Sequence, residues 1–141
     1  MASGNWSFPC SPRNPAKVRE ELRVLRSLIP HWRARDMVWS PRSGVQLEFG
    51  RRLRASGELP SAGPADASGK RDGLRFQRQA AHVSDENLRW TARARWGTYR
   101  FFGFVLTDRD GFAALTPAGE RFLDSRRPGD VLLRQLLKWQ Y

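Results

Sequence analysis

Apolar residues recur every three or four positions near the start of the chain, which is the spacing of one face of a helix. Asn14 is a suitable N-cap, Pro15 would occupy the first helical position, and Pro30 is expected to close the segment. The apolar face of this first predicted helix comprises Val18, Leu22, Leu25 and Leu28. The pattern therefore predicts a helix between Asn14 and Pro30.

A second apolar stripe predicts another helix over residues 43–56, with Gly57 as its C-terminal cap. Its members are Val45, Phe49 and Leu53. Residues 58–73 break the pattern, because Gly, Pro, Ala, Ser and Asp dominate there, a composition typical of a flexible loop or linker. Residues 1–57 are therefore expected to form an N-terminal helical part.

Two further helices are predicted after this linker. Residues 74–83 suit a short helix, and Ser84 then begins a longer one, with Asp85 and Glu86 placing negative charge in its first turn. One face of the longer helix is apolar: Leu88, Ala92, Trp96 and Tyr99, with Phe102 close by.

A change of period follows this helix. Two short apolar runs flank Asp110-Gly111, a dipeptide that tolerates the positive φ angles of tight turns, and they predict a two-stranded hairpin near residues 104–115. Thr116 and Pro117 then begin a helix that runs to about residue 123. A final helix within residues 125–141, with Asp130 as its cap, has the apolar face Val131, Leu132, Leu136 and Leu137.

The predicted fold is mainly α with one small β-hairpin. Helices followed by a hairpin over residues 74–124 are typical of a winged helix-turn-helix, here with additional N-terminal helices and a C-terminal helix over residues 125–141. In such a fold the recognition helix enters the major groove of DNA, and the hairpin lies along the DNA backbone.

Charge supports a polyanionic partner. Among 141 residues, Lys and Arg number 25 and Asp and Glu number 14, which gives a formal net charge of +11. Nearly all of the cations are arginines, which suit bidentate contact with phosphate and guanine better than lysines do. The excess favours a nucleic acid over a merely basic, solvated surface.

Three arginines of the long helix, at offsets of four and eleven, share a face that does not include the apolar stripe. The alternative is that this face is simply solvated. With the hairpin and the preceding short helix added, the residues expected to contact duplex DNA are Arg75, Arg78, Arg89, Arg93, Arg100 and Arg109.

The aromatic residues of the same region have two interpretations. They could form a platform on which bases of single-stranded nucleic acid stack, or they could belong to the core. Helical spacing next to a hairpin favours the core for all five: Trp90, Trp96, Tyr99, Phe101 and Phe102.

The sequence shows no catalytic motif. None of the three lysines lies two residues after an acidic residue, as in many Mg²⁺-dependent nucleases, and no phosphate-binding loop or nucleophile elbow occurs. His31, His82 and the single Cys10 are too few and too isolated to predict a metal site. No catalytic residue, metal ligand or cofactor is therefore assigned to this chain.

Several features favour a cytoplasmic location. One cysteine cannot form an internal disulfide, the N-terminus lacks the pattern of a signal peptide, and no apolar run is long enough to span a membrane. No membrane partner is expected.

Five stretches resemble the N-terminal part of AlwI-type type IIS restriction endonucleases and their nicking relatives. They are "SPRNPAKVREELRVL", "VQLEFGRRLRASGEL", "TYRFFGFV", "LTPAGERFL" and "LLRQLLKWQY". The resemblance implies a DNA-recognition region followed by a separate Mg²⁺-dependent nuclease domain. Because the chain ends about where the family continues toward that domain, it is expected to be a fragment, a truncated gene product or a stand-alone module. Whether it belongs to an enzyme stays open.

The function predicted from these observations is sequence-specific binding of double-stranded DNA, as the recognition portion of a restriction or nicking endonuclease. A separate nuclease domain or subunit would then be a partner. Two alternatives stay open: a small winged-helix transcriptional regulator, and a basic RNA-binding accessory protein.

Overall fold

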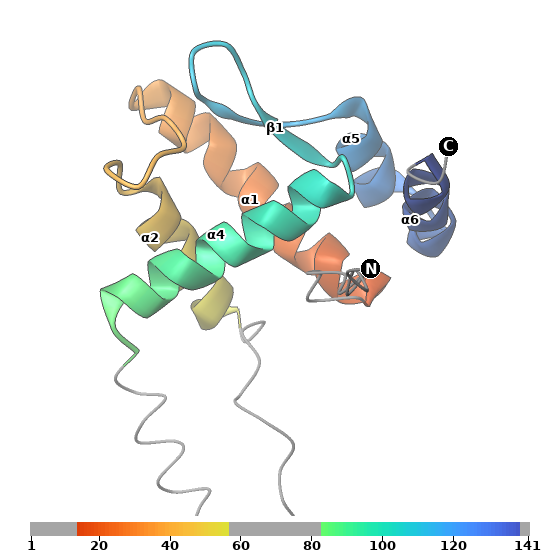
Figure 1. Ribbon diagram of the computed structural model, residues 1–141, viewed down its shortest axis with the longest axis horizontal. Coiled ribbons are helices and arrows are strands. Elements are labelled where there is room, and N and C mark those ends of the chain that lie inside the picture. The colour runs from red at the N-terminus through yellow and green to blue at the C-terminus, as the bar shows by residue number, and fades with distance from the viewer. Residues whose placement is uncertain (1–13, 57–82, 139–141) are drawn as a thin grey trace, which may run out of the picture.

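The computed structural model describes residues 14–56 and 83–138, and in these ranges the protein is mainly helical with one small antiparallel hairpin (Figure 1). The fold class predicted from the apolar pattern is confirmed at this level. In chain order the elements are α1 (Pro15–Ala34), α2 (Val45–Ala55), α4 (Asp85–Phe101), β1 (Val105–Thr107), β2 (Ala113–Leu115), α5 (Pro117–Asp124) and α6 (Pro128–Leu137).

Several predictions fall outside the described residues. These are the Gly57 cap, the linker over residues 58–73, nearly all of the short helix predicted over residues 74–83, and both of its arginines, Arg75 and Arg78.

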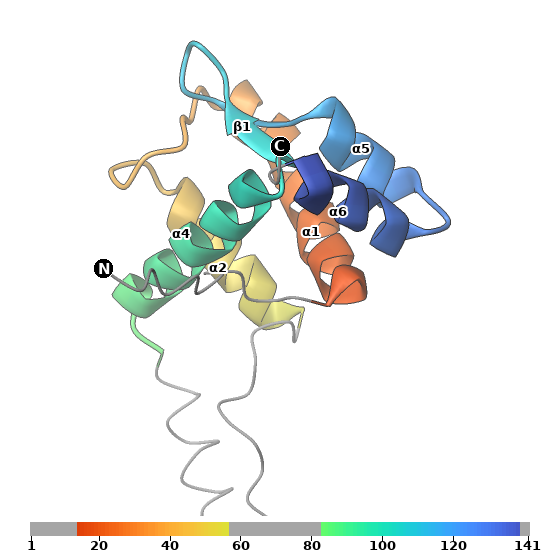
Figure 2. The ribbon, with the colours of Figure 1, turned by 45° about the vertical axis from the view of Figure 1, so that its right-hand side comes forward.

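Helix α4 crosses the α1–α2 pair, and the hairpin continues from its C-terminal end (Figures 1 and 2). The predicted apolar faces of α1, α2 and α4 are all buried, and apart from Leu88 they belong to one shared core, to which the hairpin, α5 and α6 also contribute. At the crossing of α2 and α4, a Cβ atom on Gly50 would lie 2.4 Å from the backbone oxygen of Leu88. Only glycine allows these two helices to approach so closely.

Local capping follows the sequence closely at three helices. The side chains of Asn14, Ser84 and Thr116 each accept a hydrogen bond from a backbone N–H of the first turn. The cap predicted for the last helix was wrong. Helix α6 begins at Pro128 with Arg127 at the N-cap, and Asp130 lies in its first turn. Proline suits the first helical position because its missing N–H has no partner there in any case.

The predicted end of α1 at Pro30 was also wrong, since the helix continues to Ala34. Proline removes one helical hydrogen bond, but continuation buries Trp32 almost completely. The indole N–H of Trp32 also donates a hydrogen bond to Glu48 of α2 over 2.9 Å. Burial of this large side chain outweighs the lost backbone bond.

The hairpin has the predicted position, with Leu106 of β1 paired to Ala114 of β2. Gly111 adopts a φ of 87°, as expected from the Asp110-Gly111 dipeptide. The carboxylate of Asp108 accepts hydrogen bonds from the backbone N–H groups of Asp110 and Phe112, at 3.0 and 2.9 Å. The turn is therefore closed by its own side chain.

Helix α5 is held against α1 by arginine side chains. Arg19 donates to the backbone oxygen of Leu123, and Arg26 forms ion pairs with Glu120 and Asp124. The hydrogen bond to Glu120, partly opposed by desolvation, raises the pKa of Arg26 above its ordinary value. These polar contacts add to the burial of Phe122 and Leu123 in joining α5 to the rest of the protein.

Candidate nucleic-acid interface

Buried contacts with the rest of the protein fix the rotational orientation of α4 about its own axis. Trp96 stacks on Trp39 of the α1–α2 connection, with ring centroids 4.2 Å apart and an interplanar angle of 21°. Tyr99 donates its hydroxyl proton to the buried carboxylate of Glu21 on α1 over 2.5 Å, and Arg95 lies 3.3 Å from the same carboxylate. One side of α4 therefore packs into the core.

The opposite side of α4 faces solvent. Each helical residue turns the chain by about 100°, so residues 90, 94 and 97 lie roughly opposite Leu88 and Tyr99. Trp90, Ala94 and Gly97 are all exposed, and a Cβ added to Gly97 would meet no other atom within 4 Å. The side with Trp90, Arg93, Ala94, Gly97 and Arg100 is called the outer face of α4 below.

Arg89 and Arg93 share an acidic neighbour on the same helix. Arg93 donates a hydrogen bond to Glu86 over 3.1 Å, whereas Arg89 lies 3.8 Å from that carboxylate. Their side chains are 35% and 39% exposed, respectively, and the Nε atom of Arg89 is buried. A ligand that contacts either arginine would compete with Glu86 for it.

Arg100 and Arg109 are more available. Both are exposed, and neither forms an ion pair with any residue in the ranges 14–56 and 83–138. No acidic residue occurs in the sequence between Glu86 and Asp108. Of the four arginines in this interval, Arg100 is the one without an ion pair in the described residues. A phosphate group would be attracted to this region.

Arg109 is carried by a loop that is tied to the helices. Asp108 forms an ion pair with Arg33 near the end of α1 over 2.5 Å. The backbone N–H of Trp39 donates to the backbone oxygen of Gly111 over 2.9 Å. The hairpin tip is thus fixed against the end of α1 and the α1–α2 connection, so Arg109 projects from a restrained loop.

The structure brings together part of the predicted contact set. Arg89, Arg93 and Arg100 lie along one flank of α4, beside its apolar stripe, and Arg109 lies in the adjoining hairpin. Arg75 and Arg78 belong to the residues that the structure does not describe.

The prediction that all five aromatic residues are core was wrong for Trp90. Its side chain is 64% exposed, whereas Trp96, Tyr99 and Phe102 are buried and Phe101 is partly buried. The sequence did hold the signal, because residue 90 is only two positions from Leu88 and therefore points about 200° away from it. Trp90 is the functional candidate that the sequence interpretation missed.

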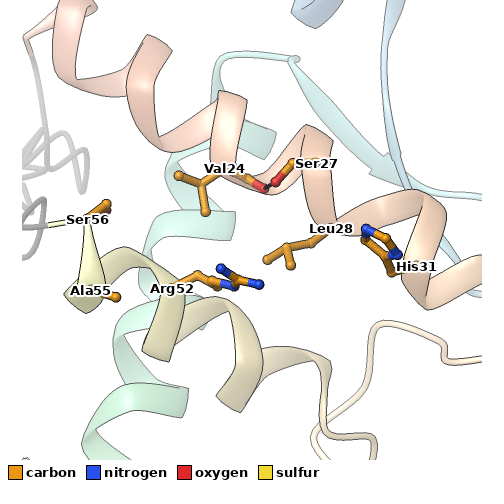
Figure 3. A pocket seen from close by; sticks show the side chains of 7 residues that line it. All are labelled: Val24, Ser27, Leu28, His31, Arg52, Ala55 and Ser56. Atoms are coloured by element: carbon orange, nitrogen blue, oxygen red, sulfur yellow. Dashed lines mark hydrogen bonds between the residues drawn. The ribbon is translucent and has the colours of Figure 1, made fainter.

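A shallow depression of about 380 Å³ lies between α1 and α2 (Figure 3). Its lining residues include Arg52 and His31 but no acidic side chain. None of its lining residues belongs to α4 or to the hairpin, so it is separate from the outer face of α4.

Within residues 14–56 and 83–138 there is no group of three or more His, Cys, Asp or Glu side chains that could hold a metal ion. None of the helices in these ranges is long and apolar enough to cross a membrane.

Comparison with known proteins adds no family: no family model matches the chain, and neither the curated proteins nor the solved structures gave a match.

Proposed function

We propose that this chain binds double-stranded DNA in a sequence-specific manner, through the outer face of α4 and the adjoining hairpin. The observation that carries the proposal is the outer face itself. Its arginines are exposed or half-exposed, its small residues leave the helix backbone accessible, and its orientation is fixed by buried contacts on the other side. Rigid presentation lowers the entropic cost of binding.

The dimensions and charge of the outer face suit the major groove. That groove admits an α-helix, and its base edges carry a distinct donor and acceptor pattern for each base pair. Arg93 can reach a guanine edge once it leaves Glu86, and Arg100 and Arg109 suit phosphate oxygens. The order of α1, α2, α4 and hairpin supports a winged helix-turn-helix with α4 as its recognition helix.

We further propose that the chain is the recognition portion of a type IIS restriction or nicking endonuclease. Support for this narrower statement comes from the five sequence stretches that resemble AlwI-type enzymes. Cleavage would need a Mg²⁺ centre supplied by a separate domain or subunit. A winged-helix regulator would use the same face of α4 but would favour a palindromic site, because regulators of this kind bind as symmetric dimers.

The two classes of arginine contact make separable predictions. If Arg93 contacts a guanine, Arg93→Ala should weaken binding to the cognate duplex by about 1–3 kcal/mol and relax specificity at one base pair. If Arg109 contacts phosphate, Arg109→Ala should weaken binding to all sequences alike and lower the slope of log K against log salt by about one unit. Titration of cognate and scrambled duplexes at several salt concentrations measures both effects.

Arg134→Ala is the matched control, because Arg134 is an exposed arginine of α6 without an ion-pair partner in the described residues. This control removes one positive charge, as the test variants do, but at a position outside α4 and the hairpin. The strongest test is the triple replacement of Arg89, Arg93 and Arg100 by alanine. A folded triple variant with unchanged affinity and unchanged salt dependence would contradict the assignment of α4 as the DNA-contacting helix.

A further inference from the structure

Trp90 is an exposed indole in the second turn of α4, between Glu86 one turn before it and Arg93 one turn after it. At 64% exposed, it is the least buried of the large apolar side chains in the described residues. Arg93 follows it by one turn on the outer face. The side chains of Ala94 and Gly97 are small, so the helix surface beside the ring does not project far from the backbone. Burial of this ring against a ligand would contribute favourable free energy to binding.

Charge complementarity identifies the kind of ligand that can cover this ring. After Glu86, the outer face of α4 has only neutral and cationic residues, and the chain as a whole carries a net charge of +11. A polyanion is therefore attracted to the surface on which the ring lies. The phosphate backbone offers no apolar group to an indole, so the ring must contact the sugar or the bases.

In the major groove the apolar feature of the bases is the C5-methyl group of thymine. Recognition helices contact base edges mainly through residues near their N-terminal ends, and Trp90 lies in the second turn of α4. The low surface formed by Ala94 and Gly97 allows the helix to approach the bases closely enough for a ring of this size to reach them.

We propose that Trp90 is a specificity-determining residue that packs on a thymine methyl group, next to the base pair contacted by Arg93. This inference rests on the proposed function. Three helical residues advance the chain by about 4.5 Å, and one base pair advances DNA by about 3.4 Å. Trp90 and Arg93 therefore contact neighbouring base pairs, and the recognition sequence contains a thymine adjacent to a guanine–cytosine pair.

The experiment uses the full chain and duplexes selected from a random pool. Each thymine of the selected site is replaced in turn by deoxyuridine, which removes only the methyl group and keeps base pairing. Burial of one methyl group predicts about a fourfold loss of affinity at one thymine for the wild-type protein. In Trp90→Ala, which should bind more weakly, that same replacement should have no further effect.

Leu133→Ala provides the matched control, because Leu133 is an exposed apolar residue of α6, at 56%. This variant should keep the full sensitivity to deoxyuridine. Circular dichroism and sedimentation of both variants establish that each is folded and show its oligomeric state.

The outcomes separate this inference from the proposed function. Failure to select any duplex, or tight binding to RNA alone, contradicts both. A selected site that contains no methyl-sensitive thymine, or a Trp90→Ala variant that keeps the methyl sensitivity, contradicts the role of Trp90 only. A wild-type dimer that becomes monomeric in Trp90→Ala, with DNA affinity unchanged, would instead assign the ring to contact with a second copy of the chain.

Discussion

Tyr99 and Arg95 of α4 meet Glu21 of α1 in a buried polar cluster, and this cluster determines which side of α4 remains outside. Glu21 is fully buried, so its carboxylate is stabilised only by groups that the protein supplies. Two of those groups belong to α4, and they oppose rotation of the helix about its axis.

Replacement of Tyr99 by phenylalanine tests this cluster. The ring packing is retained, but a hydrogen bond to a buried carboxylate is lost, which should lower the free energy of unfolding by about 1.5–3 kcal/mol. Urea denaturation followed by circular dichroism measures the loss. Trp90→Phe, a change of similar size at an exposed aromatic residue, should alter stability by less than about 0.5 kcal/mol. Equal midpoints for the Tyr99→Phe variant and the wild type would contradict a stabilising role.

Individual residues were predictable where helical spacing alone decides their environment. Leu88, Ala92 and Tyr99 are buried as their spacing predicts. The same rule, applied to Trp90, would have placed it outside. Arg95 is different, because its burial depends on Glu21, which is far away in the sequence and is brought close only by the fold.

At the scale of the helices, the crossing of α2 over α4 depends on the absence of a side chain at Gly50. The predicted clash with the Leu88 backbone cannot be relieved by rotation of a flexible side chain. Gly97, in the middle of α4, has open space around it and provides the matched control position.

Gly50→Ala should therefore lower the free energy of unfolding by about 1–3 kcal/mol, because the helices must move apart or distort. Gly97→Ala should raise it by about 0.5–1 kcal/mol, because alanine favours an exposed helix interior. Thermal and urea denaturation of the two variants measure both effects. If both substitutions shift stability in the same direction, close contact at Gly50 is not what holds the two helices.

The elements themselves were predictable to the extent that local signals specify them. Asn14, Ser84 and Thr116 cap their helices as their sequence positions predict, and the Asp110-Gly111 turn lies in the hairpin loop. The end of α1 was not predictable in this way. The helix continues beyond Pro30 because this places Trp32 in a buried position against α2, and packing between distant segments cannot be read from local signals.

At the scale of the whole molecule, several acidic side chains form ion pairs that join one helix or strand to another. Glu120 and Asp124 pair with Arg26 between α5 and α1, Asp108 pairs with Arg33, and Asp85 pairs with Arg51 of α2. Arg100 of α4 and Arg109 of the hairpin have no ion-pair partner in the described residues, but neither do Arg52, Arg54, Arg121, Arg126, Arg127 and Arg134 in and around α2, α5 and α6. The net charge predicted a polyanionic partner, but the division between structural and free arginines required the fold.

The most direct test of sequence-specific DNA binding is selection from a random pool of duplexes with the full chain, followed by sequencing of the bound fraction. We predict enrichment of one short site, at affinities that fall steeply with salt, and loss of that enrichment in the triple Arg89, Arg93 and Arg100 to alanine variant. An asymmetric site would support the restriction-type role, whereas a palindrome would favour a dimeric regulator. A bound fraction with no enriched sequence, obtained with folded protein, would contradict sequence-specific recognition of duplex DNA by this chain.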